Sequence, residues 1–248
     1  MECKAAIDSR SEEPVAEAVA SSRSDTPPDF YQNAETYWAG VEPSIRGMLG
    51  GLRFVDKPDI DASHHLLDRF GPSRCDRALD CGAGIGRVTK KLLLPRFRSV
   101  DMVEVTPKFL EQAESFIGRP DFERVGNRFC LSLRTFSPEA GAYDLIWVQW
   151  VIGHLTLPAT VAFFRRCIAG LRPPVPEEER RSVIVLKDNV LGGENSEFDE
   201  TDSSYLRSHQ ELLQVFKEAG LRVLSDELQT DMPCGLYPIR MFVLVPSN

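Results

Sequence analysis

The stretch that most constrains this chain is residues 78–87, which read ALDCGAGIGR. Its apolar start predicts a short buried strand, and Gly82, Gly84 and Gly86 predict a turn in which bare backbone approaches a ligand. Residues 88–94 are expected to continue as a helix. This order brings free backbone N–H groups and the positive end of a helix dipole to one point. The stretch therefore predicts a site for a nucleotide-like cofactor.

The spacing of the glycines narrows the class of cofactor. In the dinucleotide fingerprint G-x-G-x-x-G the third glycine would stand at position 87, which is Arg87 here. Acidic residues stand at Asp80, two positions before the first glycine, and at Glu104, near the end of the next apolar run. A carboxylate at the end of a second strand suits the two hydroxyls of an adenosyl ribose. A tight turn without a ligand is the alternative.

Composition excludes several classes of protein. The 248 residues are 42% hydrophobic, enough for a full core, and we find no apolar run long enough to cross a bilayer. A net charge of −8 argues against nucleic-acid binding and favours a cationic partner. The six cysteines have no metal-ligand spacing, so we expect reduced thiols, no metal, and a cytoplasmic or nuclear protein. Residues 1–29 are expected to be a disordered tail without a signal peptide, and residues 30–248 one catalytic domain.

Strands and helices alternate along this domain, which predicts an α/β doubly wound sheet. The last two apolar runs follow each other without a helix, so the final strand should be antiparallel in a mostly parallel sheet. Residues 30–70 precede the motif as a helical extension, and the glycine-rich segment 45–52 could fold over the cofactor as a lid. Helices are expected over residues 30–38, 61–70, 107–117, 157–171 and 205–219, and strands over 100–105, 124–131, 143–148, 181–187, 221–224 and 239–245.

The glycine motif and its following acid resemble motif I of class I S-adenosylmethionine-dependent methyltransferases, which have a Rossmann-like sheet. Further segments resemble the eukaryotic protein α-N-terminal methyltransferases over nearly all of residues 30–248. This resemblance implies transfer of methyl groups from S-adenosylmethionine to the α-amine of proteins that begin Xaa-Pro-Lys or Xaa-Pro-Arg after removal of the initiator Met. The segments are TYW (36–38), GMLGG (47–51), VQWVIGHL (148–155), KDN (187–189) and DSS (202–204).

The resemblance also implies roles for individual residues. His154 and Asp202 would lie nearest the reacting amine. The residues that would touch S-adenosylmethionine are Gly82, Arg87, Glu104, Thr106, Leu133 and Gln149. The residues that would line the substrate channel, together with Asp202, are Trp38, Trp150, Asn189, Asp199, Ser204 and Tyr237.

Three departures from the family pattern bear on these roles. Glu104 stands where the family usually has Asp, and Arg134, beside Leu133, stands where it usually has Gln. The acidic run 194–202 is one residue longer than usual, and the extra residue falls in the stretch that contains Asp199.

The same residues also have meaning without the family. The acidic run 194–202 contains no Lys or Arg and would attract an ammonium group, although a solvated loop has the same composition. Trp150 follows the end of a strand, where α/β sheets bind ligands, but it could equally be a core tryptophan. His154 could be a structural hydrogen-bonding residue, and Trp38 could serve helix packing or a cofactor lid.

Three other functions remain open at this point. A methyltransferase of the same fold could act on a small molecule, another amine or a nucleic acid. The Asp/Asn-Pro-Pro-aromatic motif of adenine-N6 enzymes is replaced here by QWVI at residues 149–152. An NAD-dependent oxidoreductase is disfavoured by Arg87, and a cofactor-binding regulatory protein without catalysis is the third alternative.

Overall fold

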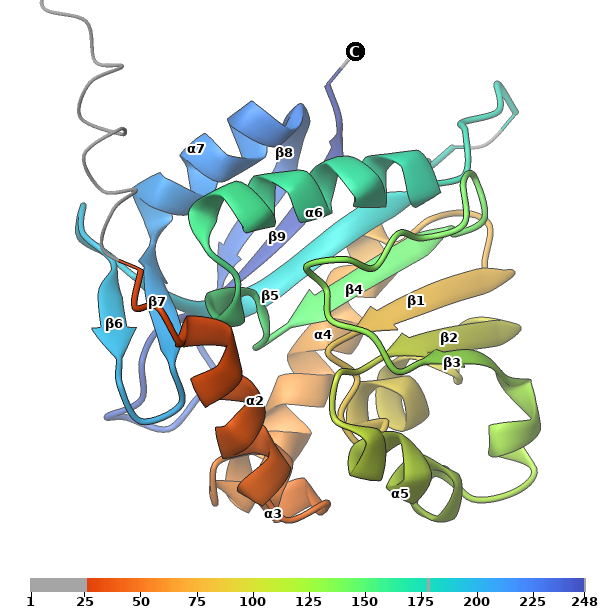
Figure 1. Ribbon diagram of the computed structural model, residues 1–248. Coiled ribbons are helices and arrows are strands. Elements are labelled where there is room, and N and C mark those ends of the chain that lie inside the picture. The colour runs from red at the N-terminus through yellow and green to blue at the C-terminus, as the bar shows by residue number, and fades with distance from the viewer. Residues whose placement is uncertain (1–25, 178, 248) are drawn as a thin grey trace, which may run out of the picture.

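The computed structural model describes residues 26–177 and 179–247, arranged around one mixed sheet (Figure 1). Most of the tail predicted for residues 1–29 lies outside the described residues. The strands run in the order β3-β2-β1-β4-β5, and β5 then pairs with both β9 and β7. The strands are β1 (Arg77–Cys81), β2 (Ser99–Val103), β3 (Val125–Phe129), β4 (Leu145–Gln149), β5 (Val183–Leu191), β6 (Glu197–Asp199), β7 (Ser204–Ser208), β8 (Leu221–Leu228) and β9 (Ile239–Pro246).

The first five strands are parallel and β9 is antiparallel to β5, which confirms the predicted fold class. Strand β4 is buried throughout, as is usual for a central parallel strand with both faces covered. Strand β5 is longer than its neighbours. Its middle pairs with β9, and its last two residues pair with β7, so β5 carries the chain from the core sheet to a separate hairpin of β6 and β7.

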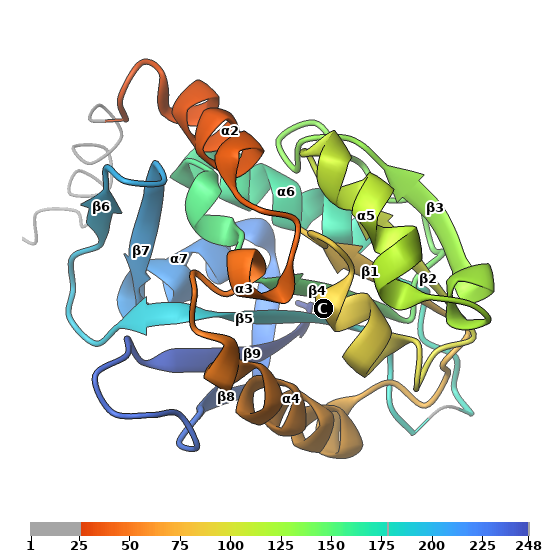
Figure 2. The same cartoon turned by 90° about the horizontal axis from the view of Figure 1, so that it is seen from below.

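Helices cover both faces of the sheet (Figures 1 and 2). Helices α6 and α7 pack into one apolar cluster, and α4, α5 and the turn after β1 pack into the other. In the part of the chain that the structure describes, no helix is long and apolar enough to span a membrane. The α-helices are α2 (Phe30–Gly40), α3 (Ile45–Met48), α4 (Asp56–Phe70), α5 (Pro107–Ile117), α6 (Leu157–Gly170) and α7 (His209–Ala219). Shorter turns of helix are η1 (Arg53–Val55), η2 (Thr89–Leu93), η3 (Asp121–Arg124) and η4 (Ile152–His154).

Helix α2 lies across the carboxyl ends of the strands and is tied there at both ends (Figures 1 and 2). At its start, Ser203 Oγ donates a hydrogen bond to the Phe30 carbonyl at 2.9 Å, and the Phe30 ring packs on Tyr205 of β7. Near its end, Trp38 contacts His154. The predicted N-terminal extension therefore forms a cover over this edge of the sheet.

Several predicted boundaries were wrong. The helix predicted over residues 205–219 begins only at His209, because Ser208 caps it by accepting a hydrogen bond from the Glu211 N–H. Residues 204–208 form β7 instead, and part of the predicted acidic loop pairs with it as β6. The helix predicted to begin at Asp61 begins at Asp56.

Two predictions about the segments 45–52 and 88–94 also need correction. The glycine-rich segment 45–52 was not among the expected helices, yet its first four residues form α3, because Ser44 Oγ accepts a hydrogen bond from the Gly47 N–H. The helix predicted over residues 88–94 is largely a π-helix, in which the Leu94 N–H bonds to the Thr89 carbonyl five residues earlier. Such turns are frequent at functional sites.

Candidate active site

The glycine turn after β1 needs glycine for both conformation and space. Gly82 and Gly84 have φ of +73° and +54°, in the left-handed region that other residues rarely adopt. A Cβ on Gly82 would lie 2.7 Å from the Val151 side chain, and a Cβ on Gly84 would lie 2.5 Å from Met48 Sδ. The Asp80 carboxylate fastens the turn to the following helix. It does so by accepting hydrogen bonds from the N–H and the hydroxyl of Thr89, at 3.0 and 2.6 Å.

Glu104 reaches from the end of β2 to this turn. Its Oε2 accepts a hydrogen bond from the Gly84 N–H at 2.9 Å, and its Oε1 accepts one from the Thr106 N–H at 2.8 Å. Burial raises the pKa of Glu104, and the backbone N–H groups oppose that shift. Thr106 thus lies behind Glu104, and Glu104 braces the glycine turn while its carboxylate lines the space over that turn.

A cavity opens over the glycine turn, beneath α2. Five of the six residues predicted to touch S-adenosylmethionine line it: Gly82, Arg87, Glu104, Leu133 and Gln149. Apolar and aromatic walls with a few convergent polar groups are typical of cofactor sites. The bare backbone and the buried carboxylate fit an adenosyl cofactor, and Arg87 offers a cation for a carboxylate.

A second cavity lies between α3, the β6–β7 hairpin and the loop that joins β8 to β9. It brings together the predicted substrate residues from distant parts of the chain. These lining residues are Trp38, Trp150, Asn189, Asp199, Asp202, Ser204 and Tyr237. Trp38, Met48, Trp150 and His154 line both cavities, so these four side chains form the wall between them.

His154 stands in this wall with both ring nitrogens engaged. The Trp38 indole N–H donates to His154 Nε2 at 2.9 Å, so Nε2 is an acceptor and the proton is on Nδ1. Nδ1 lies 3.3 Å from the Ser203 carbonyl, to which it donates. Burial lowers the pKa of His154, while the charge of Asp202 opposes the shift. His154 is therefore neutral at pH 7, in one defined tautomer.

Two polar atoms, one in this wall and one in the second cavity, have no hydrogen-bond partner in the described part of the chain. Asp202 Oδ1 and Trp150 Nε1 are both buried, and neither has a hydrogen-bond partner within residues 26–177 and 179–247. Buried groups of this kind are costly unless something satisfies them. Trp150 also has φ of +50°, a strained backbone conformation for a bulky residue, and the Arg87 guanidinium lies 5.3 Å from the centre of its ring. This edge is thus arranged to receive a donor at Asp202 and an acceptor at Trp150.

Trp38→Phe is expected to raise the pKa of His154, because the hydrogen bond that favours neutral Nε2 would be lost. The aromatic ring would stay in place. An NMR titration of the His154 ring measures this shift. Tyr37→Phe, on the adjacent and more exposed residue of α2, is the control. An unchanged His154 titration in Trp38→Phe would contradict the tautomer assigned above.

Glu104→Ala is expected to weaken S-adenosylmethionine binding by about 1.5–3 kcal/mol for each charge-assisted hydrogen bond lost. The loss has two sources, since Glu104 both braces the Gly84 N–H and faces the cavity. Calorimetric titration gives the affinity. Peptide affinity should change little, and an equal loss for both ligands would indicate general misfolding instead.

Arg134, which stands where the family usually has Gln, makes a cation–π contact. Its guanidinium lies 4.2 Å from the centre of the Tyr31 ring on α2, and the Tyr31 hydroxyl contacts Thr156 Oγ1 at 3.3 Å. Arg134 therefore connects helix α2 to the segment beside Leu133. This cation–π contact is the structural consequence of the departure seen in the sequence.

Four residues around the cavities were missed by sequence analysis. Met48 lies over Gly84, and Asp59 and Lys187 form a buried ion pair beside the first cavity. Asp188 lines the second cavity, and burial raises its pKa to about 7. The segments GMLGG and KDN contain Met48, Lys187 and Asp188 and were noticed only as family likeness. For Asp59 the one available signal was a carboxylate on an otherwise apolar helix face.

Comparison with known proteins agrees with this geometry. The sequence profile of a family described as "AdoMet dependent proline di-methyltransferase" matches residues 26–245. The chain is 45% identical to mouse N-terminal Xaa-Pro-Lys N-methyltransferase 1 over 220 residues, covering 87% of this chain and 95% of the relative. It is 42% identical to alpha N-terminal protein methyltransferase 1 of Caenorhabditis elegans over 233 residues, covering 92% and 96%.

Solved structures are also similar. A SAM-dependent methyltransferase from Leishmania major superposes with a TM-score of 0.80 at 33% identity, over 87% of this chain and 82% of that one. The mitomycin 7-O-methyltransferase MmcR superposes with a TM-score of 0.60 at 19% identity, over 82% and 56%, and shows the fold alone.

Proposed function

Because the chain belongs to the family of AdoMet-dependent proline di-methyltransferases, we propose that it methylates the free α-amine of proteins that begin Xaa-Pro-Lys or Xaa-Pro-Arg. It is an S-adenosylmethionine-dependent methyltransferase. The observation that carries the proposed substrate is the second cavity, in which acidic side chains adjoin the aromatic wall of Trp38 and Trp150. The names of the relatives favour protein N-termini over a small-molecule amine.

The reaction requires an uncharged amine, because a protonated nitrogen has no lone pair. An α-amine has a pKa of about 8 and a Lys side chain one of about 10.4, so roughly 10% and 0.04% are uncharged at pH 7. The α-amine is therefore the better nucleophile. Bound S-adenosylmethionine supplies the methyl group on a positively charged sulfur, and the protein must supply alignment and a proton acceptor.

We assign the proton acceptor to Asp202 and His154. Asp202 Oδ1 has no hydrogen-bond partner in the described chain and lines the second cavity, so it is free to accept from an incoming ammonium group. His154 lies at the wall between the cavities, and its Nε2 lone pair, which accepts the Trp38 N–H, would take a proton only in exchange for that hydrogen bond. In this arrangement Asp202 holds the ammonium, and the neutral imidazole lies beside it.

The remaining residues would select the peptide. A Pro at its second position would pack against the Trp38 and Trp150 rings, and Asn189 would bond its backbone. Lys or Arg at the third position would meet the carboxylates of β6 and its following turn, Asp199 among them.

Mass spectrometry of an Xaa-Pro-Lys peptide incubated with the protein and S-adenosylmethionine tests the proposed function. We expect the mass of the peptide to rise at its α-amine in steps of about 14 Da, each of which is one methyl group in place of a hydrogen. Methylation of a free Lys side chain, or none, would contradict it.

Selection at the third position should be electrostatic. Replacing Lys by Gln in the peptide is expected to raise KM, because the carboxylates of the second cavity would stay unpaired. Added salt should narrow the difference between the two peptides, since screening grows with ionic strength. Steady-state kinetics at low and high salt measures both effects. Equal methylation of the Lys and Gln peptides at low salt would point to a different amine substrate.

A further inference from the structure

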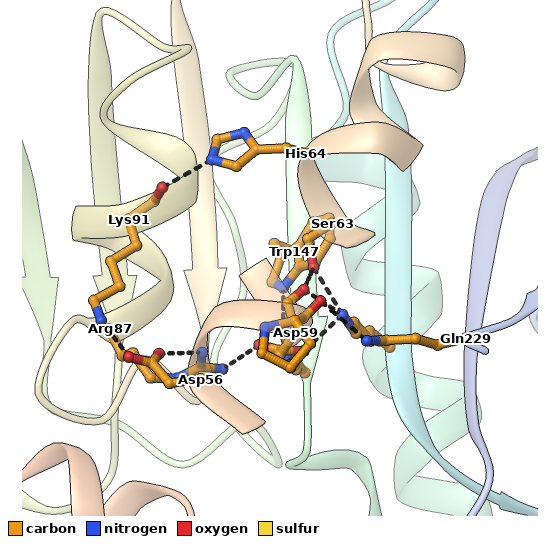
Figure 3. Close-up of polar contacts among 11 residues, drawn as sticks. Asp56, Asp59, Ser63, His64, Arg87, Lys91, Trp147 and Gln229 are labelled. Atoms are coloured by element: carbon orange, nitrogen blue, oxygen red, sulfur yellow. Dashed lines mark hydrogen bonds and ion pairs between the residues drawn. The ribbon is translucent and has the colours of Figure 1, made fainter. Parts of the chain in front are cut away.

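Asp59 of α4 is a fully buried carboxylate held between two cations. Its Oδ1 lies 2.6 Å from Lys187 Nζ, and its Oδ2 lies 2.8 Å from Arg87 Nη2. Burial alone would raise the pKa of Asp59, but the charges of Lys187 and Arg87 outweigh it and lower that pKa. Asp59 is therefore ionised at pH 7. Figure 3 shows it among Asp56, Ser63, Arg87 and Trp147.

The partners of Asp59 come from three separate elements that meet at the cofactor cavity. Arg87 follows the glycine turn, Gln149 ends β4, and Lys187 is paired with Gln149 across β4 and β5. Gln149 Nε2 donates to Asp59 Oδ1 at 2.8 Å, while Gln149 Oε1 accepts from the Trp147 indole N–H at 2.9 Å. These two bonds fix the orientation of the Gln149 amide.

The arrangement extends from Asp59 to the wall between the cavities. Arg87 bonds Asp59 with one amino group and Asp56 with the other, at 3.2 Å, and its guanidinium faces the Trp150 ring. Lys187 Nζ also donates to the Asp59 carbonyl and to Ser63 Oγ, which ties β5 to α4 just before Asn189. One carboxylate thus sets the direction of Arg87 and Gln149, which both line the first cavity.

We propose that Asp59 is a positioning residue for cofactor binding: it touches neither ligand but orients Arg87 and Gln149 toward S-adenosylmethionine. This inference rests on the proposed assignment of Arg87 and Gln149 to the cofactor site. A structural role alone would predict a loss of stability and nothing more. Positioning predicts, in addition, a loss of cofactor affinity that stability does not explain.

The chain offers a matched control at the other end of the same strands. Asp144, just before β4, is also fully buried and forms an ion pair with Arg172 at 2.7 Å. It accepts hydrogen bonds from the backbone N–H groups of Asp76 and Arg77, beside the start of β1. Asp59→Asn and Asp144→Asn remove the same charge from equally buried sites, and we expect both to lower Tm.

The experiment measures the Kd of S-adenosylmethionine by calorimetry, and Tm, for both variants. Asp59→Asn should raise Kd by about 10- to 100-fold, the range known for residues that orient metal ligands, while Asp144→Asn should leave Kd unchanged. Equal Kd values for the two variants would overturn the positioning role.

A double variant covers the case in which Asp59→Asn does not fold. Asp59→Leu with Lys187→Met replaces the buried ion pair by apolar groups, a change that often preserves stability. It leaves Gln149 Nε2 without its acceptor and Arg87 with Asp56 alone. We expect a Tm near that of the wild type and a Kd still raised about 10-fold or more. A wild-type Kd would overturn the inference. The Kd of Arg87→Ala, measured in the same way, distinguishes a failure of this inference from a failure of the proposed cofactor site. An unchanged Kd for Arg87→Ala would refute the cofactor site itself.

Discussion

Asp202→Asn is expected to lower kcat by about 10²- to 10⁴-fold while the Kd of S-adenosylmethionine stays unchanged. The substitution keeps the shape of the side chain but removes the charge and the proton-accepting oxygen beside the amine. Asp202 Oδ1 is buried without a hydrogen-bond partner in the described chain, so it has no structural bond to lose. Rapid-mixing kinetics with an Xaa-Pro-Lys peptide and calorimetry with the cofactor alone measure the two quantities.

Asp199→Asn is the matched control for this prediction. Asp199 lines the same cavity but is exposed, and its Oδ1 already accepts a hydrogen bond from the Thr201 N–H at 2.8 Å. We therefore expect Asp199→Asn to raise the peptide KM and to change kcat little. A wild-type kcat for Asp202→Asn would remove that residue from the proposed acid-base pair. A similar loss of kcat in both variants would indicate a general effect of loop charge.

The glycine turn and the carboxylate beside it could be predicted from the sequence because their determinants are local. Strand, glycine turn and helix follow one another within residues 77–93, and β1 and β2 are parallel neighbours in which Cys81 pairs with Val103. This register places the next residue, Glu104, beside the turn that follows Cys81. What the sequence did not indicate is the second use of Glu104, as the acceptor for the Gly84 N–H.

The polar contacts between distant segments could not be predicted in the same way. Asp59 and Lys187 lie 128 residues apart, and hydrophobic periodicity does not say which buried acid meets which buried base. The prediction even began this helix at Asp61, so Asp59 fell outside it. Only the fold, which brings α4 against the middle of β5, makes the pair visible.

The β6–β7 hairpin was missed for a related reason. Its acidic and Ser-rich sequence has the composition of a loop, and strand propensity is weak there. The hairpin forms because β7 adds to the end of β5, and because Phe198 and Tyr205 pack against the Phe30 ring of α2. These contacts are tertiary, and they override the local preference. The same contacts place Asp202 at the cavity.

Gly84→Val is expected to reduce S-adenosylmethionine affinity by about 100-fold or more. Two effects add: a β-branched residue at φ of +54° is strained by about 1–3 kcal/mol, and its Cβ would point at Met48 Sδ, 2.5 Å away, inside the cofactor cavity. Met48 can turn aside because its side chain is flexible, but the new methyl groups would then occupy the space over the turn. Calorimetric titration measures the loss.

Gly118→Val separates these two effects. Gly118 has φ of +77° at the end of α5, and a Cβ there would meet nothing within 4 Å, so this variant carries the backbone strain without the obstruction. Both variants should lower Tm, but only Gly84→Val should lose the cofactor. If Gly84→Val bound S-adenosylmethionine as the wild type does, the glycine turn would not be the cofactor site. If Gly118→Val lost binding equally, strain transmitted through the fold, rather than occupied space, would account for the loss.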